Sequence, residues 1–196
     1  MRKSREETAR TRERIIAAAG HEFRRNGIAA TGLAGLMSAA GLTHGGFYKH
    51  FSSKDELVAE ACGKSINGTL DDLVERVAAE PPERRLRAFL AAYLSAAHRD
   101  HPENGCGLAA LGSELGRAGD ATRAAVTRAF ERMVDIIVQY LPAPQAPDAR
   151  ARARTIMAAL VGTVAMARAI DDPALSDRLL EDAQDSLAAM AGPPAG

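Results

Sequence analysis

Residues 31–57 read TGLAGLMSAAGLTHGGFYKHFSSKDEL, and this stretch decides the fold of the N-terminal part of the chain. Gly41 can adopt the positive φ that a tight connection between two helices needs, and Thr43 can cap the helix that follows. The apolar residues on both sides of this turn can share one small core, and they are Leu33, Leu36, Met37, Leu42, Phe47 and Phe51. The stretch is therefore typical of a helix-turn-helix, in which the second helix enters the major groove of DNA.

The helix expected over residues 43–51 has an outward face that suits contact with a duplex. Near its start, His44, Gly45 and Gly46 offer a small polar group and bare backbone where base edges and phosphates would approach. Further along the helix, phosphate ligands are available from Tyr48, Lys49 and His50.

The helix after this one begins with a capping box. In Ser53-Lys-Asp-Glu56 the side chains of Ser53 and Glu56 can accept hydrogen bonds from the first backbone N–H groups. The remaining N–H groups and Lys54 are then directed outward. Thr31 can cap the preceding helix in the same way. Together these helix starts and basic side chains predict a clamp for DNA phosphates.

Charge is distributed unevenly along the chain. Lys and Arg number 25 and Asp and Glu also number 25, so the formal net charge is zero. Residues 1–51 nevertheless hold nine basic and four acidic residues, a surplus of +5 that suits a polyanion partner such as DNA. Two interpretations stay open for the basic tail from Arg2 to Arg5: contact with the DNA backbone or a minor groove, and a solubilising tail without contacts.

Composition limits the class of protein. With 196 residues, 46% of them hydrophobic and 26% charged, the chain matches an average globular protein. Its first residues lack the apolar segment of a secretory signal, and the uncharged stretch over residues 155–167 is shorter than the about 20 residues of a membrane-spanning helix. Two cysteines, Cys62 and Cys106, are too few for a disulfide framework. We therefore expect a soluble, cytoplasmic protein without a membrane partner.

Helix-forming residues with apolar spacings of three and four predict an all-α fold. Glycine, proline and capping residues divide the chain into about nine helices. The fourth could bend at Gly63 or Gly68. The expected helices cover residues 8–26, 31–40, 43–51, 53–79, 83–99, 108–118, 121–141, 149–170 and 174–191.

The succession Gly-Leu-Thr…Gly-Phe-Tyr-x-His-Phe-x-Ser-Lys-Asp-Glu-Leu from Gly41 to Leu57 resembles the DNA-binding region of tetracycline-repressor (TetR) family regulators. The resemblance implies a homodimer with a three-helix DNA-binding domain over residues 1–52 and a helical ligand-binding and dimerising domain over residues 53–196. Such a protein would repress transcription from a palindromic operator and leave it when a small molecule binds. By position, Thr31, Thr43, Tyr48, Lys49 and Lys54 would contact phosphates, and His44, Gly45 and Gly46 would face bases.

Three positions depart from the family pattern. Met37 stands where a small alanine is usual, so the two helices of the motif could pack differently. His44 stands where a longer basic side chain is frequent, and Gly46 replaces a common threonine. These departures leave two options open: weak base reading by side chains, or reading through close backbone approach and DNA shape.

The last two expected helices carry apolar stripes that predict a dimer interface. Stripes from two chains could form a four-helix contact between identical surfaces. The alternative left open is that the stripes pack only within their own chain. The predicted interface residues are Ile156, Leu160, Val164, Leu175, Leu179, Ala183 and Leu187.

The resemblance also places a pocket for an unidentified small molecule among the fourth to eighth helices. An ordinary core position is the alternative for every residue predicted to line it. These residues are Ile66, Leu70, Phe89, Tyr93, Cys106, Leu111, Met133, Ile137 and Met157.

Cys106 supports a second hypothesis, a thiol-based sensor of oxidants or electrophiles, because it stands at an expected helix start where the helix dipole favours negative charge. A metal site shared with His98 and His101 has no standard ligand spacing, and no cofactor is predicted. The sequence lacks the motifs G-x-S-x-G and H-E-x-x-H and a phosphate-binding loop, so an enzyme is not expected. A helical interaction protein without DNA binding remains as an alternative, but it does not explain the basic N-terminal part.

Overall fold

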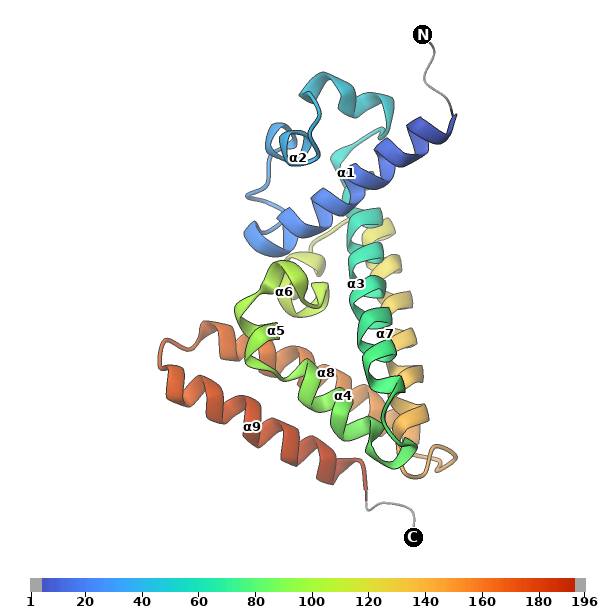
Figure 1. The fold of residues 1–196 in the computed structure, drawn as a ribbon, viewed down its shortest axis with the longest axis vertical. Helices are drawn as coiled ribbons and strands as arrows, with labels where there is room; N and C mark the ends of the chain where they lie inside the picture. Colours follow the sequence, from blue (N-terminus) through green and yellow to red (C-terminus); the bar gives the residue numbers. More distant parts are fainter. Residues whose placement is uncertain (1–4, 193–196) are drawn as a thin grey trace.

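The computed structural model of the chain describes residues 5–192. Every regular element within that range is a helix, which confirms the predicted all-α class. The tail contact proposed for Arg2 to Arg5 lies outside the described residues, except for Arg5 itself, which begins the first helix. The elements, labelled in Figure 1, are α1 (Arg5–Asn26), α2 (Leu33–Ala39), the 3₁₀ helix η1 (His44–Lys49), α3 (Lys54–Ala78), η2 (Pro82–Arg84), α4 (Arg85–Tyr93), α5 (Ala96–Asp100), η3 (Pro102–Asn104), α6 (Gly107–Leu115), α7 (Asp120–Tyr140), α8 (Ala149–Ala169) and α9 (Pro173–Met190).

The elements α1, α2 and η1 form a small unit at one end of the molecule, which we call the head (Figure 1). Its core is built by apolar side chains that recur every three or four residues along α1 and meet α2 and η1. The buried residues of this core include Ile15, Ile16, Ala19, Phe23, Leu36, Met37, Phe47 and Phe51.

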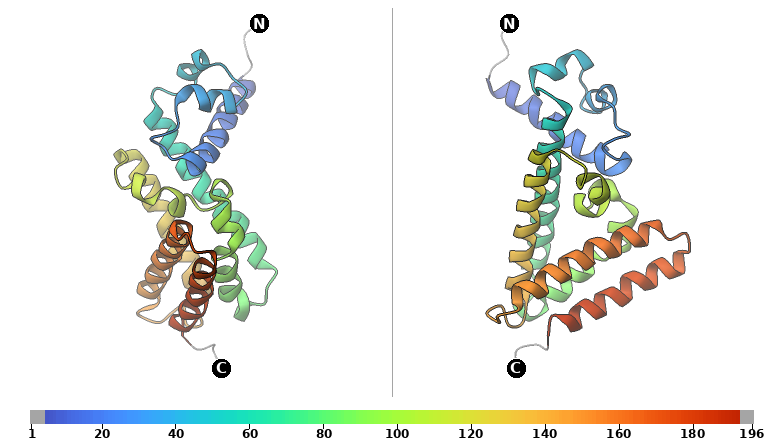
Figure 2. Two further views of the ribbon diagram at one scale, coloured as in Figure 1. Left: turned by 90° about the vertical axis from the view of Figure 1, so that its left-hand side faces the viewer. Right: turned by 180° about the vertical axis from the view of Figure 1, so that it is seen from behind.

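α3 links the head to the rest of the chain, the body (α3 to α9). It runs for 25 residues without interruption, so neither Gly63 nor Gly68 breaks it. Near its start it crosses α1, where a Cβ on Gly20 would lie 3.5 Å from the Ala61 carbonyl oxygen. Further along it lies beside α7 (Figures 1 and 2), with Gly63 facing Ala125. Because α3 packs on both parts, the domain boundary predicted at residues 52–53 stays a prediction.

The far end of the body is formed by α8 and α9, which run antiparallel to each other (Figure 2). α9 begins where the Asp172 carboxylate accepts hydrogen bonds from the N–H groups of Ala174 and Leu175. Pro173 occupies the first helical position, where its missing N–H costs nothing. This helix start agrees with the sequence prediction.

The helix predicted over residues 83–99 is divided in the structure. α4 ends at Tyr93, and Leu94 has a ψ of 41°, outside the helical range. Ser95 then caps α5, because its hydroxyl accepts a hydrogen bond from the His98 N–H at 3.2 Å. A single helix across this point was therefore the wrong prediction. After the break the chain leads through α5 to η3, which contacts α1.

Among the described residues, no helix is both long enough and apolar enough to cross a lipid bilayer.

Candidate nucleic-acid interface

The turn of the helix-turn-helix is closed by backbone hydrogen bonds around Gly41. Gly41 has a φ of +66°, and its N–H donates to the Ser38 carbonyl at 2.8 Å. The Leu42 N–H donates to the Met37 carbonyl at 2.8 Å. This pair of bonds is the Schellman arrangement, which ends a helix at a left-handed glycine. The positive φ predicted for Gly41 is confirmed.

Arg14 of α1 holds the turn against the rest of the head. Its Nη2 donates to the Ala40 carbonyl at 2.6 Å, so a carbonyl at the end of α2 is satisfied by a side chain. A Cβ on Gly41 would lie 3.1 Å from the same Nη2. A side chain at this position would therefore meet both the unfavourable φ and the guanidinium.

The segment after the turn is the 3₁₀ helix η1 rather than the predicted α-helix. Two consecutive glycines within it explain the difference, because glycine has low helix propensity. Phe47 anchors η1 in the head, since it is fully buried and its ring centroid lies 5.6 Å from that of Phe51. Tyr48 is 67% exposed. The other predicted DNA contacts of this segment that are exposed are Thr43, His44, Gly45 and Lys49, and Gly46 is half-buried.

Two departures from the family pattern lie against each other. Met37 is fully buried, and a Cβ on Gly46 would lie 3.6 Å from its terminal Cε. The longer side chain of Met37 therefore fills the space beneath η1 next to a residue that has no side chain. The outer surface of η1 consequently offers backbone rather than side-chain atoms at Gly46.

Three predicted roles need correction. Thr31 is buried and its hydroxyl donates to the Gly27 carbonyl at 2.5 Å, so it neither caps α2 nor presents the hydroxyl to a phosphate. The Lys54 ammonium donates to the carbonyls of Ile28 and Thr31, both at 2.7 Å, and thus joins the start of α3 to the connection after α1. Thr43 precedes η1 in the extended conformation, but its hydroxyl accepts no capping bond.

The predicted capping box at the start of α3 is present in a shifted form. The Ser53 hydroxyl accepts a hydrogen bond from the Glu56 N–H at 3.1 Å, as predicted. The Glu56 carboxylate, however, accepts from the N–H of Ser52 at 2.7 Å and from its hydroxyl at 2.6 Å. These bonds from Ser52 hold the pKa of Glu56 below its usual range. The box therefore fixes the residues between η1 and α3.

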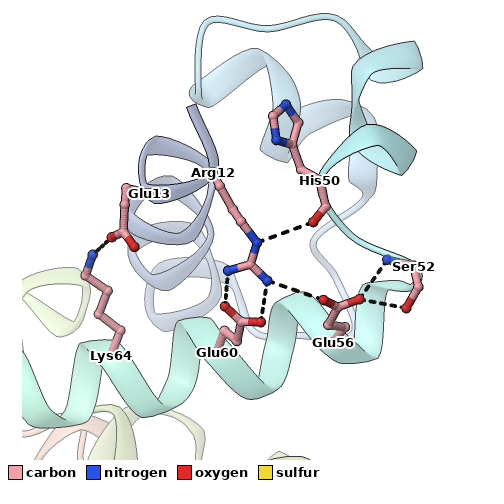
Figure 3. A network of polar contacts seen from close by, with 7 residues as sticks. All are labelled: Arg12, Glu13, His50, Ser52, Glu56, Glu60 and Lys64. Carbon is pink, nitrogen blue, oxygen red and sulfur yellow. Dashed lines mark hydrogen bonds and ion pairs between the residues drawn. The ribbon is translucent and has the colours of Figure 1, made fainter. Parts of the chain in front are cut away.

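Arg12 of α1 forms the polar centre of the head (Figure 3). Its guanidinium donates to both carboxylate oxygens of Glu60, to Glu56 at 3.3 Å and to the His50 carbonyl at 3.4 Å. The same group lies 4.5 Å from the centre of the Phe51 ring. The hydrogen bond to Glu60 raises the pKa of Arg12. This network connects α1, α3 and the residue that follows η1.

Sequence reasoning did not single out Arg12. One signal was available, because Glu56 and Glu60 are four residues apart and therefore share one face of α3. A second ion pair between the same two helices joins Lys64 to Glu13 (Figure 3). Both pairs brace α1 against the helix that enters the body.

The residues predicted to line a ligand pocket are all buried, at most 2% exposed, and they form the packed core of the body. The structure does contain a cavity of about 340 Å³ between α3, α4, α5 and η3. Of the predicted residues, Tyr93 alone lines this cavity. That a ligand pocket is lined by Ile66, Leu70, Phe89, Cys106, Leu111, Met133, Ile137 and Met157 stays a prediction. The side chains that line it include Thr69, Asp72, Leu73, Arg76, His98 and His101.

The predicted dimer interface also needs correction. Ile156, Leu160 and Val164 are fully buried and Leu187 is buried, so these residues pack inside their own chain. Leu175 is 45% exposed, and Leu179 and Ala183 are half-buried. Among the large apolar residues of α8, Met166 is exposed, at 57%. Both helices thus carry small or apolar residues that are exposed or half-buried, and we call this set the outer face. It consists of Ala158, Gly162, Ala165 and Met166 on α8, and of Leu175, Leu179, Ala183 and Met190 on α9.

Cys106 is 1% exposed and directly precedes α6. Its N–H donates to Nε2 of His98 at 2.8 Å, and Nδ1 of the same ring lies 2.6 Å from the Tyr93 carbonyl. The ring therefore carries its proton on Nδ1, and burial lowers the pKa of His98. The described residues contain no group of three or more His, Cys, Asp or Glu side chains placed to hold a metal ion.

Comparison with known families gives two matches. A model of bacterial regulatory proteins of the tetR family matches residues 15–61, which include α2, η1 and the start of α3. A model of the C-terminal domain of LmrA/YxaF-like transcriptional regulators matches residues 82–180.

Similar proteins are regulators of the helix-turn-helix type. The regulator TtgR of Pseudomonas putida is 42% identical over 73 residues, which cover 37% of this chain and 34% of TtgR. An uncharacterized regulator of Bacillus subtilis, YerO, is 34% identical over 96 residues, which cover 47% of this chain and 32% of YerO. The chain thus matches about a third of the length of these relatives.

Solved structures resemble the whole fold. The reduced form of NemR from E. coli superimposes on this chain with a TM-score of 0.80 at 19% identity, and the match covers 95% of this chain and 100% of NemR. A regulator of the TetR family from Cytophaga hutchinsonii superimposes with a TM-score of 0.79 at 25% identity, and the match covers 95% of this chain and 98% of that regulator.

Proposed function

Because the chain belongs to the tetR family of bacterial regulatory proteins, we propose that it is a transcriptional repressor that binds a palindromic operator as a homodimer and leaves it when a small molecule binds the body. The family itself makes the chain a DNA-binding transcriptional regulator and not an enzyme. Repression, the dimer and the small-molecule response are the parts that we propose.

The observation that carries the proposal is that η1 is exposed and is held at both of its ends. Its two ends are fixed, by the Schellman turn at Gly41 before it and by the Arg12 network at His50 after it. Between these ends Phe47 is buried, while Tyr48 and Lys49 are exposed. A segment held in this way can enter a groove with little further loss of backbone conformational entropy.

Lys49 provides a first test of this interface. Its side chain is exposed on η1, so we expect Lys49→Gln to lower DNA affinity and to reduce the slope of log K against log salt by about one. Lys54→Gln is the matched control, because its ammonium is bonded to the Ile28 and Thr31 carbonyls. We expect that variant to lower the melting temperature and to leave the slope unchanged. A slope that is unchanged in Lys49→Gln would contradict the phosphate contact.

The outer face of α8 and α9 supports the homodimer. It combines exposed small residues of α8, such as Gly162 and Ala165, with larger apolar residues of α9, such as Leu175 and Leu179. Small residues permit close approach of helices, and identical surfaces pair around a twofold axis. In such a dimer the two η1 segments would read half-sites about one turn of DNA apart, about 34–36 Å.

The cavity between α3, α4, α5 and η3 is our proposed effector site. It has a volume of about 340 Å³, which fits the size range of small-molecule sites. Its wall includes Asn104 at the end of η3, and η3 contacts α1 of the head. An occupant that displaced η3 would therefore act on the head directly.

The experiment that tests the function is selection of bound duplexes from a random pool by the purified full chain. We expect enrichment of an inverted repeat, and a subsequent screen of small molecules should find compounds that release the repeat. A compound that binds at the proposed cavity should lose its effect in Arg76→Ala, since Arg76 is exposed in the cavity wall. Failure to enrich any sequence at low ionic strength would overturn the proposal.

Oxidation of Cys106 is the alternative signal. Its burial argues against it, because a thiol must be reached by the oxidant. We expect Cys106→Ser to bind the selected operator as tightly as the unchanged protein does. Its DNA binding should also respond to hydrogen peroxide as that of the unchanged protein does. The control, Cys62→Ser, should behave in the same way. Loss of a peroxide-induced release in Cys106→Ser alone would replace the small-molecule proposal with the redox one.

A further inference from the structure

The connection between α1 and α2 is bonded to a carboxylate of the body. Glu114 of α6 accepts a hydrogen bond from the Ile28 N–H at 3.1 Å with one oxygen and from the Ala29 N–H at 2.8 Å with the other. Both N–H groups lie just after the end of α1. Hydrogen bonds to a charged acceptor are stronger than neutral ones, so this is a firm attachment between distant parts of the chain.

Gly27 makes room for this carboxylate. Its φ is +86°, and its N–H donates to the Phe23 carbonyl at 2.8 Å, so it turns the chain sharply at the end of α1. A Cβ at this position would lie 2.8 Å from Oε1 of Glu114, which is too close for a real contact. Glycine is therefore needed twice here, for the backbone conformation and for the approach of Glu114.

A second attachment lies one turn earlier on α1. The Arg24 guanidinium donates to the Glu103 carbonyl of η3, with Nε at 2.8 Å. Burial lowers the pKa of Arg24. The C-terminal end of α1 is thus held by two neighbouring elements of the body, η3 and α6, and Figure 1 shows α6 beneath this end of the helix.

These attachments give α1 two supports at different places along its length. One is α3, which crosses α1 at Gly20 and binds Arg12 through Glu60. The other is the pair of contacts from η3 and α6 beyond that crossing. Because α3 is continuous into the body, a movement of α6 relative to α3 would tilt α1 and, through α2, which contacts both α1 and η1, the rest of the head.

We infer that Glu114 is a positioning residue for DNA binding: its carboxylate fixes the angle at which the head is held on the body, and thereby the separation of the two η1 segments in a dimer. The inference rests on the proposed function, because it assumes a dimer that reads two half-sites. It adds the residue through which a movement in the body would be transmitted to the head.

The first test needs no DNA. Amide hydrogen exchange of the full chain is compared between the unchanged protein, Glu114→Ala and the control Glu75→Ala, which removes an exposed carboxylate from α3. We expect the Ile28 and Ala29 amides to exchange about tenfold faster in Glu114→Ala only, because their acceptor is gone. Equal exchange of these two amides in all three proteins would overturn the inference.

The second test separates positioning from general stability. Binding is measured to the selected inverted repeat and to a duplex that carries one half-site. We expect Glu114→Ala to bind the repeat about tenfold more weakly and to bind the half-site as the unchanged protein does, because η1 itself is intact. Equal weakening on both duplexes would mean that Glu114 is merely structural and would overturn the inference.

The two tests also distinguish the inference from the proposed function. An unchanged protein that binds no duplex would overturn the proposed function, while faster exchange at Ile28 and Ala29 in Glu114→Ala would still support the attachment.

Discussion

Phe47→Ala is expected to abolish DNA binding and to lower the free energy of unfolding by about 3–5 kcal/mol. Phe47 is fully buried and is the residue through which η1 is anchored in the core of the head. Its ring centroid lies 5.6 Å from that of Phe51 and 5.2 Å from that of Tyr48. Removing the ring leaves a cavity beneath η1, and a folded domain has only about 5–15 kcal/mol to lose.

The matched control for this variant is the neighbouring aromatic residue. Tyr48 is 67% exposed, so Tyr48→Ala should change the melting temperature little and weaken DNA binding only by the loss of one contact. Thermal unfolding followed by circular dichroism, together with binding to the selected duplex, distinguishes the two variants. Equal melting temperatures for both would show that Phe47 does not anchor η1.

The turn could be predicted from sequence because its cause is local. Gly41 follows a short helix and precedes Leu42, and the backbone bonds that close the turn link residues at most five positions apart. The form of the following segment was harder to predict. Its position followed from the turn, but the two glycines reduce helix propensity enough for a 3₁₀ helix to replace the α-helix.

The polar contacts that hold the head could not be predicted, because they join residues far apart in the chain. Arg12 and Glu60 are separated by 48 positions, and Glu114 and Ile28 by 86. A charged residue on an exposed helix face looks the same in sequence whether it is solvated or paired. Only the crossing of α1 over α3 and the approach of α6 reveal these partners.

The cavity lies away from most of the residues predicted to line a pocket, for a related reason. Large apolar residues such as Phe89 and Met133 were expected to line it, but in a close-packed interior such residues contact one another. The cavity lies instead where α4 and α5 are divided at Leu94, and polar residues such as Asp72 and Arg76 border it. Residues on both sides of this break line the cavity, and the sequence pattern did not indicate the break.

The dimer interface was predicted on α8 and α9, and several of the residues named for it are buried within their own chain. α8 is rich in alanine, so its apolar pattern covers most of its circumference and does not identify one face. The larger residues, such as Ile156 and Leu160, fill the core of their own chain. The smaller ones, such as Ala158 and Gly162, remain outside together with Met166.

This corrected face leads to the second large effect: Met166→Glu should convert a dimer into a monomer. Met166 is 57% exposed on α8 and belongs to the outer face with Leu175 of α9. Around a twofold axis each chain would bring its own glutamate to the contact, and two desolvated negative charges there would oppose association. A monomer reads one half-site at a time, so we expect operator affinity to fall by about a hundredfold or more.

Ala124→Glu is the control, because it adds the same charge to an exposed position of α7, away from the outer face. Sedimentation equilibrium gives the mass of each protein, and the half-site duplex shows whether η1 still binds. We expect Met166→Glu to sediment as a monomer, to melt as a folded protein and to keep its half-site affinity, because the substituted side chain lies on the surface. If Met166→Glu remained a dimer with full operator affinity, the chains would have to pair through another surface, and the two η1 segments would then be held apart by elements other than α8 and α9.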